Sequence, residues 1–276
     1  MFRNLVAFLV VTLIGAAASA RPAQRCSIDL AHSPQWICNQ DDGTACSVTD
    51  AEVNQMFWPG SSCGITTVNE DTTDAVAWTQ ETANGGWETS GDATDDEGIQ
   101  ILIGASNSTA SNGPCVFSPG DAYYMKVKFS IPVVADYDVA IIGFRNDGAF
   151  SSSGTVDDVA EWNTTTPVYD DFAVININAG DWRTYTQDDG GTATDTNITT
   201  TTAVGGTAYT AMLKVSSAGA VTYFVDGTNQ ATSNGAVAFT LDQAAADLYV
   251  PTVVFGRAAA GTDDMPDLLL LECGLQ

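Results

Sequence analysis

Residues 208–227, AYTAMLKVSSAGAVTYFVDG, constrain the fold more than any other part of this sequence. In the second half of the stretch Val221, Tyr223 and Val225 alternate with Thr222, Phe224 and Asp226, and a short Ser-Ala-Gly sequence precedes them. A period of two on both sides of a glycine-containing turn predicts a β-hairpin with one face on a core. The Asp-Gly pair that ends the stretch predicts a second turn, in which the glycine supplies a positive φ.

Short runs of the same kind recur along the chain after residue 70. Clusters of Gly, Asn, Asp, Ser and Thr separate them, and helical periodicity is weak throughout. The runs expected to form strands are residues 75–80, 98–104, 122–131, 137–145, 171–178, 182–187, 207–216, 220–226, 236–240, 248–257 and 268–273. Many strands at this spacing predict an all-β fold, a two-sheet antiparallel sandwich or jelly roll.

Two of these runs indicate which faces are buried. Residues 122–131 carry apolar side chains at the odd positions from 123 to 129, with Lys126 and Lys128 at even positions between them. This alternation predicts a half-buried strand whose charges face water. In residues 137–145 both faces are apolar, which predicts a strand at the centre of a sheet.

The first 20 residues, MFRNLVAFLVVTLIGAAASA, have the features of a secretory signal peptide. Arg3 precedes an apolar run, and the segment ends in Ala-Ser-Ala, which fits a cleavage site. The run is shorter than the roughly 20 residues that span a bilayer, so we expect cleavage and no stable membrane insertion. The expected location is extracellular or at the cell surface, with the periplasm as an alternative.

All six cysteines follow the predicted cleavage position, an even number in a chain bound for an oxidising compartment. They are Cys26, Cys38, Cys46, Cys63, Cys115 and Cys273. We expect disulfides and not zinc, because the sequence has a single His and no Cys-x-x-Cys pair. The expected bonds are Cys26 with Cys38, Cys46 with Cys63, and Cys115 with Cys273, although sequence alone leaves the connectivity open.

The cysteines also suggest how the chain is divided. Residues 21–68 hold four of the six among polar and turn residues, which predicts a short N-terminal segment stapled by disulfides. Residues 69–276 are expected to form the jelly-roll domain, which is long enough for one large core.

The chain is strongly acidic, with 34 acidic and 9 basic residues and a formal net charge of −25. Nucleic acid is excluded as a partner, because such a surface repels a polyanion and no basic cluster is visible in the sequence. Two interpretations of the acidity remain. One is solubility in a salty medium, and the other is that a few turn aspartates supply oxygen ligands for Ca²⁺.

Catalytic patterns are scarce. The only histidine, His32, lies in the cysteine-rich segment, and phosphate loops, dinucleotide fingerprints and His-Glu zinc motifs are missing. A glycosidase needs only two carboxylates, but the candidate Asp95-Asp96-Glu97 places neighbouring acids on opposite faces of a strand. We therefore expect a protein that is not an enzyme, with a glycoside hydrolase or polysaccharide lyase as the minority alternative.

A long connection at residues 146–169 is the main candidate site, since it exceeds the ~12–15 residues usual for an irregular loop. The loop and its flank hold the candidate Ca²⁺ ligands Asp157, Asp158, Glu161, Asp170 and Asp171. Aromatic residues there and on the next run offer platforms for a sugar ring: Trp162, Tyr169, Trp182 and Tyr185, with Arg183 beside them. The alternatives are a solvated acidic loop and an ordinary strand face.

Several motifs resemble a known superfamily. Residues 208–227, followed by LYVPTVVFGR, resemble the concanavalin A-like lectin/glucanase superfamily, in particular laminin G-like jelly rolls. The wider order of DDEGIQILIG, AYYMKVKFSI, DVAIIGFR, YDDFAVININ, VTYFVDG and LLLLECGLQ is similar to uncharacterised surface or virion proteins of marine bacteriophages and their hosts. The resemblance implies the two-sheet jelly roll, and no catalytic residue of the family carries over.

Together these observations predict a secreted, non-enzymatic, lectin-like module that recognises a glycan or surface polysaccharide or acts in adhesion, with Ca²⁺ as the candidate ion. The first alternative is a structural subunit that self-assembles in a virion, fibre or surface layer. The second is the glycoside hydrolase or polysaccharide lyase.

Overall fold

The computed structural model describes sixteen parts of the chain, and the statements below concern these parts. They are residues 25–29, 46–48, 53–57, 64–69, 76–80, 87–90, 98–106, 113–134, 139–148, 169–178, 180–188, 191–198, 202–230, 238–243, 247–256 and 266–276.

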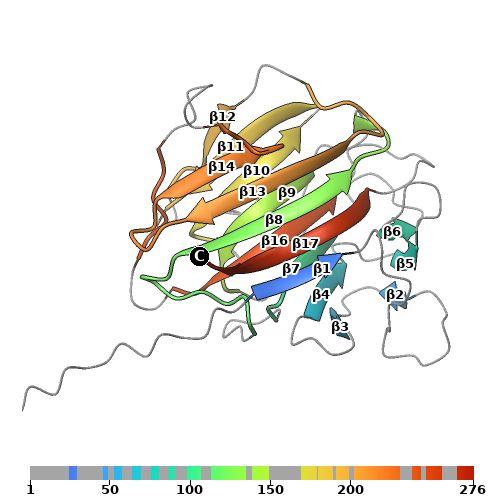
Figure 1. Cartoon of the computed structure of the whole chain (residues 1–276), viewed down its shortest axis with the longest axis horizontal. Helices are drawn as coiled ribbons and strands as arrows, with labels where there is room; N and C mark the ends of the chain where they lie inside the picture. Colours follow the sequence, from blue (N-terminus) through green and yellow to red (C-terminus); the bar gives the residue numbers. More distant parts are fainter. Residues whose placement is uncertain are drawn as a thin grey trace, which may run out of the picture.

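The described strands form two antiparallel sheets stacked face to face (Figure 1). The nine-stranded sheet A runs in the order β15 (Thr228–Asn229), β14 (Val221–Val225), β13 (Ala208–Val215), β8 (Tyr123–Ser130), β17 (Asp267–Leu275), β6 (Trp87–Ser90), β5 (Val76–Gln80) and β2 (Cys46–Val48), and β1 (Arg25–Asp29) also pairs with β17. The eight-stranded sheet B runs in the order β12 (Thr194–Asn197), β11 (Asp181–Gln187), β10 (Phe172–Asn178), β9 (Val139–Asn146), β16 (Tyr249–Gly256), β7 (Gly98–Ile103), β4 (Gly64–Asn69) and β3 (Val53–Phe57). The predicted all-β jelly-roll sandwich is confirmed.

The hairpin predicted at residues 208–227 is formed by β13 and β14. The Ser216 side-chain oxygen holds the first turn by accepting hydrogen bonds from the backbone N–H groups of Ala218 (3.3 Å) and Ala220 (3.1 Å). Asp226 and Gly227 make the second turn, with φ values of 47° and 78°. Two consecutive positive φ values match the two-residue hairpin turn that Asp-Gly favours, and this turn leads into β15.

Alternation along the strands fills the space between the sheets. The odd residues of β8, from Tyr123 to Phe129, are fully buried there. Tyr123 stacks on Phe117 with ring centroids 4.5 Å apart and meets the edge of Phe144 from sheet B at 4.8 Å. β9 lies between β10 and β16, and the described side chains on both of its faces are buried, so the predicted central strand is also confirmed.

Residues 21–68 contribute strands to both sheets. β1 pairs with β17, β2 pairs with β5, and β4 joins β3 to β7. The sequence predicted no strand before residue 75, because these runs are only three to six residues long and lie among turn residues. A strand was expected at residues 236–240. In the described part of this run the chain forms only an isolated bridge, between Ala220 and Thr240.

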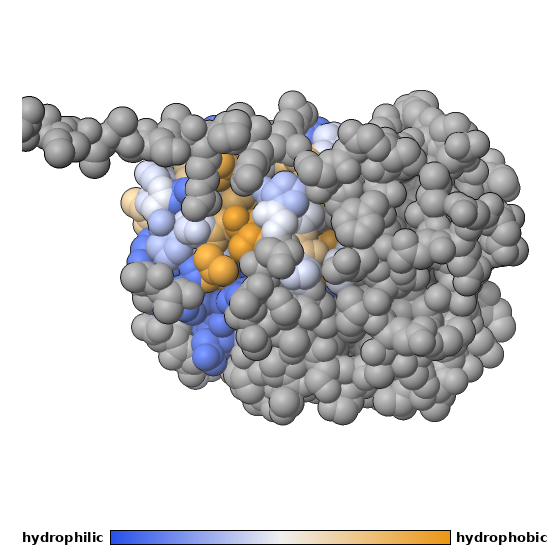
Figure 2. Space-filling model, turned by 90° about the horizontal axis from the view of Figure 1, so that it is seen from below, coloured by the Kyte–Doolittle hydropathy of each residue, from blue (hydrophilic) through white to orange (hydrophobic). Residues whose placement is uncertain are grey.

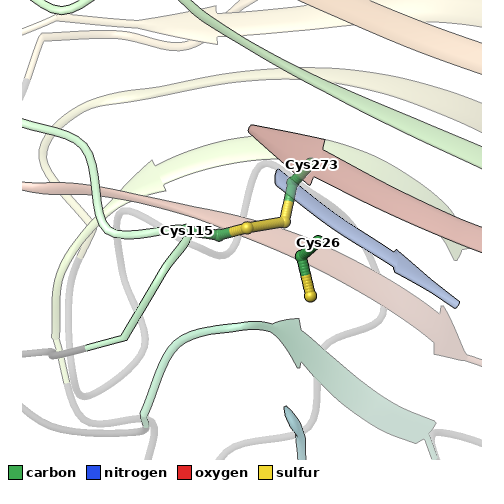
Figure 3. Close-up of side chains that lie close together, drawn as sticks. All are labelled: Cys26, Cys115 and Cys273. Carbon is green, nitrogen blue, oxygen red and sulfur yellow. A yellow bond between two sulfur atoms is a disulfide. The ribbon is translucent and has the colours of Figure 1, made fainter. Parts of the chain in front are cut away.

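The cysteines join the N-terminal strand to the last one. The predicted Cys115–Cys273 disulfide is confirmed, and Cys26 lies opposite Cys273 in the register of β1 and β17. Cys26 is buried and disulfide-bonded as well, and the three sulfur atoms lie within 4.8 Å of one another (Figure 3). The side chains of Cys38, Cys46 and Cys63 lie outside the described residues, so their pairing stays a prediction.

The described surface mixes residue types. Seen from below, an apolar strip runs between hydrophilic residues (Figure 2). Within the described ranges no helix is both long and apolar enough to cross a membrane. The predicted signal peptide, residues 1–20, lies outside these ranges and stays a prediction.

Buried tyrosines provide a test of the core. Burial raises the pKa of Tyr223, so its hydroxyl stays neutral, and this hydroxyl has no hydrogen-bond partner among the described residues. Tyr249 differs, because its hydroxyl donates to the Asp242 carbonyl at 2.8 Å. We expect Tyr223→Phe to leave the free energy of unfolding unchanged or raise it, and Tyr249→Phe to lower it by about 1 kcal/mol. Urea denaturation of both variants checks this, and equal losses in the two would contradict it.

The Cys115–Cys273 bond closes a loop of 158 residues in sequence separation. Long loops gain most from a cross-link, so the double variant Cys115→Ala/Cys273→Ala is expected to lower the free energy of unfolding by about 3–5 kcal/mol. Denaturation of the variant beside the wild type measures the difference. A loss below ~1 kcal/mol would show that the bond does not restrict the unfolded chain as this account requires.

Candidate functional site

The face of sheet B turned away from sheet A carries polar side chains from five neighbouring strands. We call them the outer band: Gln100 on β7, Thr252 on β16, Arg145 on β9, Asn176 on β10 and Gln187 on β11. The exposure of each residue is 1% or less. Polar side chains buried together on one face need partners, so the outer band is the strongest candidate site in the described part of the chain.

Alternation and register explain why these residues share a face. On β9, Phe144 points into the core between the sheets, so Arg145 points outward. Phe172 pairs with Arg145 on one side and with Gln187 on the other, which places these three residues in one row across the sheet. Asn176 is four residues from Phe172 on the same strand and therefore faces the same way.

Contacts with Tyr169 and Asn146 help to hold Arg145 in place. Its guanidinium carbon lies 4.1 Å from the centre of the Tyr169 ring, and its Nη1 donates to the Asn146 carbonyl at 2.8 Å. A cation over an aromatic face is attracted by the ring's quadrupole, most strongly when both groups are shielded from water. The pair is buried, so Arg145 and Tyr169 form a fixed positively charged corner of the outer band.

The three amide side chains have hydrogen-bonding capacity to spare. Gln100 donates to the Thr252 hydroxyl at 3.1 Å, and the Asn176 oxygen accepts from the Ala140 N–H at 3.1 Å. Among the described residues, no partner is found for the Gln100 oxygen, the Asn176 nitrogen or either amide atom of Gln187. An unpaired buried polar group costs about 1–3 kcal/mol, so a bound polar molecule would stabilise this arrangement.

Apolar and aromatic residues frame the outer band. The cluster on this face comprises Ile141, Tyr169, Phe172, Val174, Tyr185 and Val254. Amide donors and acceptors set among aromatic and aliphatic side chains suit a ligand with hydroxyl groups and C–H faces. The outer band contains no carboxylate or imidazole, so its own residues provide no general acid and base pair.

The predicted aromatic platform divides between the two faces of sheet B. Tyr169 and Tyr185 are brought together in the outer cluster. Trp182 lies on the opposite face, where it is 2% exposed and meets Tyr209 edge-on with ring centroids 5.3 Å apart. Because Trp182 packs between the two sheets, it is a core residue and not a ligand platform.

Arg183 lies near the edge of sheet B. Its guanidinium forms an ion pair with Asp195 of the neighbouring strand β12 at 2.8 Å, and both side chains are about one-third exposed. Arg183 also lies opposite Asn176 in the register of β10 and β11, so it shares the face of the outer band, with its guanidinium paired to Asp195.

The predicted Ca²⁺ ligands are only partly described. Asp170 is exposed, whereas Asp171 is 3% exposed. Asp157, Asp158 and Glu161 lie outside the described residues, and so does the predicted sugar platform Trp162. In the described part of the chain, the one convergent set of three metal-binding side chains is Cys26, Cys115 and Cys273, whose disulfide bonds make them unsuitable as ligands. The calcium site stays a prediction.

Asp171 interacts with its surroundings through its charge and through its backbone carbonyl. Burial raises the pKa of Tyr249, and the nearby negative charge of Asp171 adds to this shift. The Asp171 carbonyl also accepts a hydrogen bond from the Asn146 N–H at 2.8 Å. Asp171 therefore joins the start of β10 to the end of β9, beside the outer band.

Sequence reasoning missed Gln100, Arg145, Asn176, Gln187 and Thr252. A signal was present, because Arg145 ends the apolar run DVAIIGFR and Asn176 interrupts FAVININ. A polar residue within a strand that is apolar on both faces indicates a buried polar group that needs a partner. Only the register of β9, β10 and β11 shows that these residues belong to one face.

Comparisons with known proteins bear on the fold. No protein-family model matches the sequence, and no curated protein matches it significantly. Among solved structures, the chain is similar to the carbohydrate recognition domain of Emp47p, with 11% identity, 86% of this chain and 99% of that chain covered, and a TM-score of 0.47. It is similar to peanut lectin, with 11% identity, 84% and 97% covered, and a TM-score of 0.45. It is also similar to an alginate lyase from Pseudomonas aeruginosa, with 12% identity, 78% and 84% covered, and a TM-score of 0.41. At these identities and TM-scores the similarities show no function for this chain.

The outer band predicts an unusual response to mutation. Gln187→Leu replaces an amide that has no described partner with an apolar side chain of similar size, so the melting temperature is expected to stay the same or rise. Gln230→Leu is the matched control, because the Gln230 amide donates to the Thr228 carbonyl at 3.0 Å and its loss is expected to destabilise. Differential scanning calorimetry compares the two. A lower melting temperature for Gln187→Leu than for Gln230→Leu would contradict the assignment.

Proposed function

We propose that this chain is a secreted, non-enzymatic lectin-like protein that binds a glycan through the outer band of sheet B and acts in recognition or adhesion at the cell surface. The observation that carries the proposal is the set of three buried amides with unpaired atoms on one face, beside the Arg145–Tyr169 pair.

Sugar hydroxyls fit this set because each one both donates and accepts hydrogen bonds. The Asn176 nitrogen supplies a donor, the Gln100 oxygen supplies an acceptor, and Gln187 supplies both. The aromatic and aliphatic frame, with Tyr169 and Tyr185, provides contact for the apolar C–H faces of a sugar ring. The specificity of such a site comes from a few placed polar groups in an apolar setting.

The composition of the outer band favours binding over catalysis. Glycoside hydrolysis requires two carboxylates placed about 5–9.5 Å apart across the scissile bond. The outer band contains amides, a hydroxyl and a guanidinium instead. The minority alternative, a glycoside hydrolase or polysaccharide lyase, is therefore kept only as an outcome of the test below.

Secretion is supported by the cysteines. Disulfides persist in oxidising compartments, and both Cys26 and the Cys115–Cys273 pair are bonded. These bonds add to the signal-like first 20 residues, which end in Ala-Ser-Ala. Calcium is a separate part of the proposal, because its ligands would be different residues from those of the outer band. The residues proposed to hold it are Asp157, Asp158, Glu161, Asp170 and Asp171.

A glycan array, run with calcium chloride and with a chelator, tests the proposal. We expect at least one class of saccharide to bind, and Gln187→Leu to weaken that binding about two- to tenfold because hydrogen bonds to the ligand are lost. Gln230→Leu, which lies just after β15 of sheet A, is expected to retain full binding. Calcium dependence would support the metal part of the proposal alone.

Two results would contradict it. Failure of every saccharide to bind, with and without calcium, would remove glycan recognition and leave a self-assembling structural subunit as the better account. Release of shortened or unsaturated sugars from bound polysaccharide would show that the protein is an enzyme.

A further inference from the structure

All three lysines of this chain lie on the outer face of sheet A. Lys126 and Lys128 are on β8, and Lys214 is on the adjacent strand β13. Their core-facing neighbours Val127, Leu213 and Val215 fix this orientation by alternation. Sheet A is the nearer sheet in Figure 1, so its outer face is turned toward the viewer. The sequence showed no basic cluster because β8 and β13 are far apart along the chain.

The register sets the spacing of the three charges. Lys126 and Lys128 are two residues apart on one strand, which separates their Cα atoms by about 7 Å. Lys126 pairs with Met212, so Lys214 lies diagonally across from Lys126, at about 7–8 Å. The three ammonium groups therefore form a compact group on a chain whose net charge is −25.

These lysines form no close ion pair with the described acids around them, although Glu272 lies opposite Lys126 in the register of β8 and β17. No hydrogen bond or ion pair found in the described part of the chain involves Lys126, Lys128 or Lys214. Three described acids lie on this face: Glu272, then Asp267 opposite Ser130 in the same register, and Asp226 just after β14. Glu272 is 9% exposed and accepts the Tyr124 hydroxyl at 2.7 Å, and Asp226 accepts the Thr210 N–H at 2.8 Å.

Aromatic side chains lie between the charges. The Lys214 ammonium is 5.4 Å from the centre of the Phe224 ring, and Tyr124 stands opposite Lys214 in the register of β8 and β13. Tyr124 and Phe224 are partly exposed, whereas the outer band of sheet B is buried. We call Tyr124, Lys126, Lys128, Lys214 and Phe224 the lysine face.

We propose that the lysine face binds a linear polysaccharide that carries carboxylate or sulfate groups. Three ammonium groups on one face of two adjacent strands attract anionic groups along a chain, and the rings beside them provide contact for sugar C–H faces. At physiological salt the Debye length is about 8 Å, so acidic residues farther away than this are largely screened from the lysine face. A second copy of this chain is a poorer occupant, because it brings another net charge of −25 to the surface.

This proposal stands apart from glycan binding at the outer band. The two surfaces belong to different sheets and face in opposite directions. One is a buried set of neutral amides with an arginine, and the other is a partly exposed set of lysines. Variants of one surface therefore leave the other intact.

The experiment measures binding of alginate, dextran sulfate and neutral dextran to the purified protein by biolayer interferometry at low and high sodium chloride. We expect alginate or dextran sulfate to bind, neutral dextran not to bind, and the affinity to fall as salt rises. The triple variant Lys126→Gln/Lys128→Gln/Lys214→Gln is expected to lose about tenfold or more in affinity for the anionic polymer without a change in melting temperature. Arg183→Gln, which removes an ion-paired charge from sheet B, is the matched control and is expected to change affinity less than about twofold.

Four results would overturn the proposal. The first is that neither anionic polymer binds at low salt, and the second is that the triple variant binds them as tightly as the wild type. The third is salt-sensitive oligomers of the wild type without polysaccharide that are missing in the triple variant, which would assign the lysine face to a second copy. Loss of anionic polymer binding in Gln187→Leu, with full binding in the triple variant, would place the ligand on the outer band instead.

Discussion

Packing of the two sheets against one shared core is the constraint on which the rest of this structure depends. Tyr123, Phe129 and Phe144 have to face inward, and a strand has a period of two, so every neighbouring position on those strands faces outward. The core-facing residues therefore also determine which side chains lie on the outer faces of the sheets. On β9 this places Arg145 on the outside of sheet B, and on β8 it places Lys126 and Lys128 on the outside of sheet A.

The two outer faces then differ in a way that suits different ligands. The face of sheet B is buried, and its polar groups are amides and one guanidinium among aromatic residues. The face of sheet A is partly open, and its three lysines form no close ion pair in the described part of the chain. Burial favours directional hydrogen bonds to a neutral polar ligand, because an unmade bond is costly there. Partial exposure favours charge-driven contact that weakens with salt.

Much of the fold was predictable because it depends on local pattern. Alternation within residues 208–227 and 122–131 gave the correct strands and faces, and the Cys115–Cys273 bond followed from the need to tie down the last strand. The candidate sites were less predictable because they depend on pairing between distant strands. Trp182 shows the limit most clearly. Trp182 and Tyr185 are three residues apart on one strand, so they have to lie on opposite faces, and only the core packing decides which face is inside.

The central claim is that the buried amides of sheet B bind a glycan, and NMR of their side-chain NH₂ groups tests it most directly. Each of Gln100, Asn176 and Gln187 gives its own pair of amide signals in an ¹⁵N-labelled protein. On titration with a saccharide that binds, this account predicts that the signals of Asn176 and Gln187 shift together and saturate with the same affinity as binding. Saturation of binding with these signals unmoved, while resonances elsewhere shift, would contradict it.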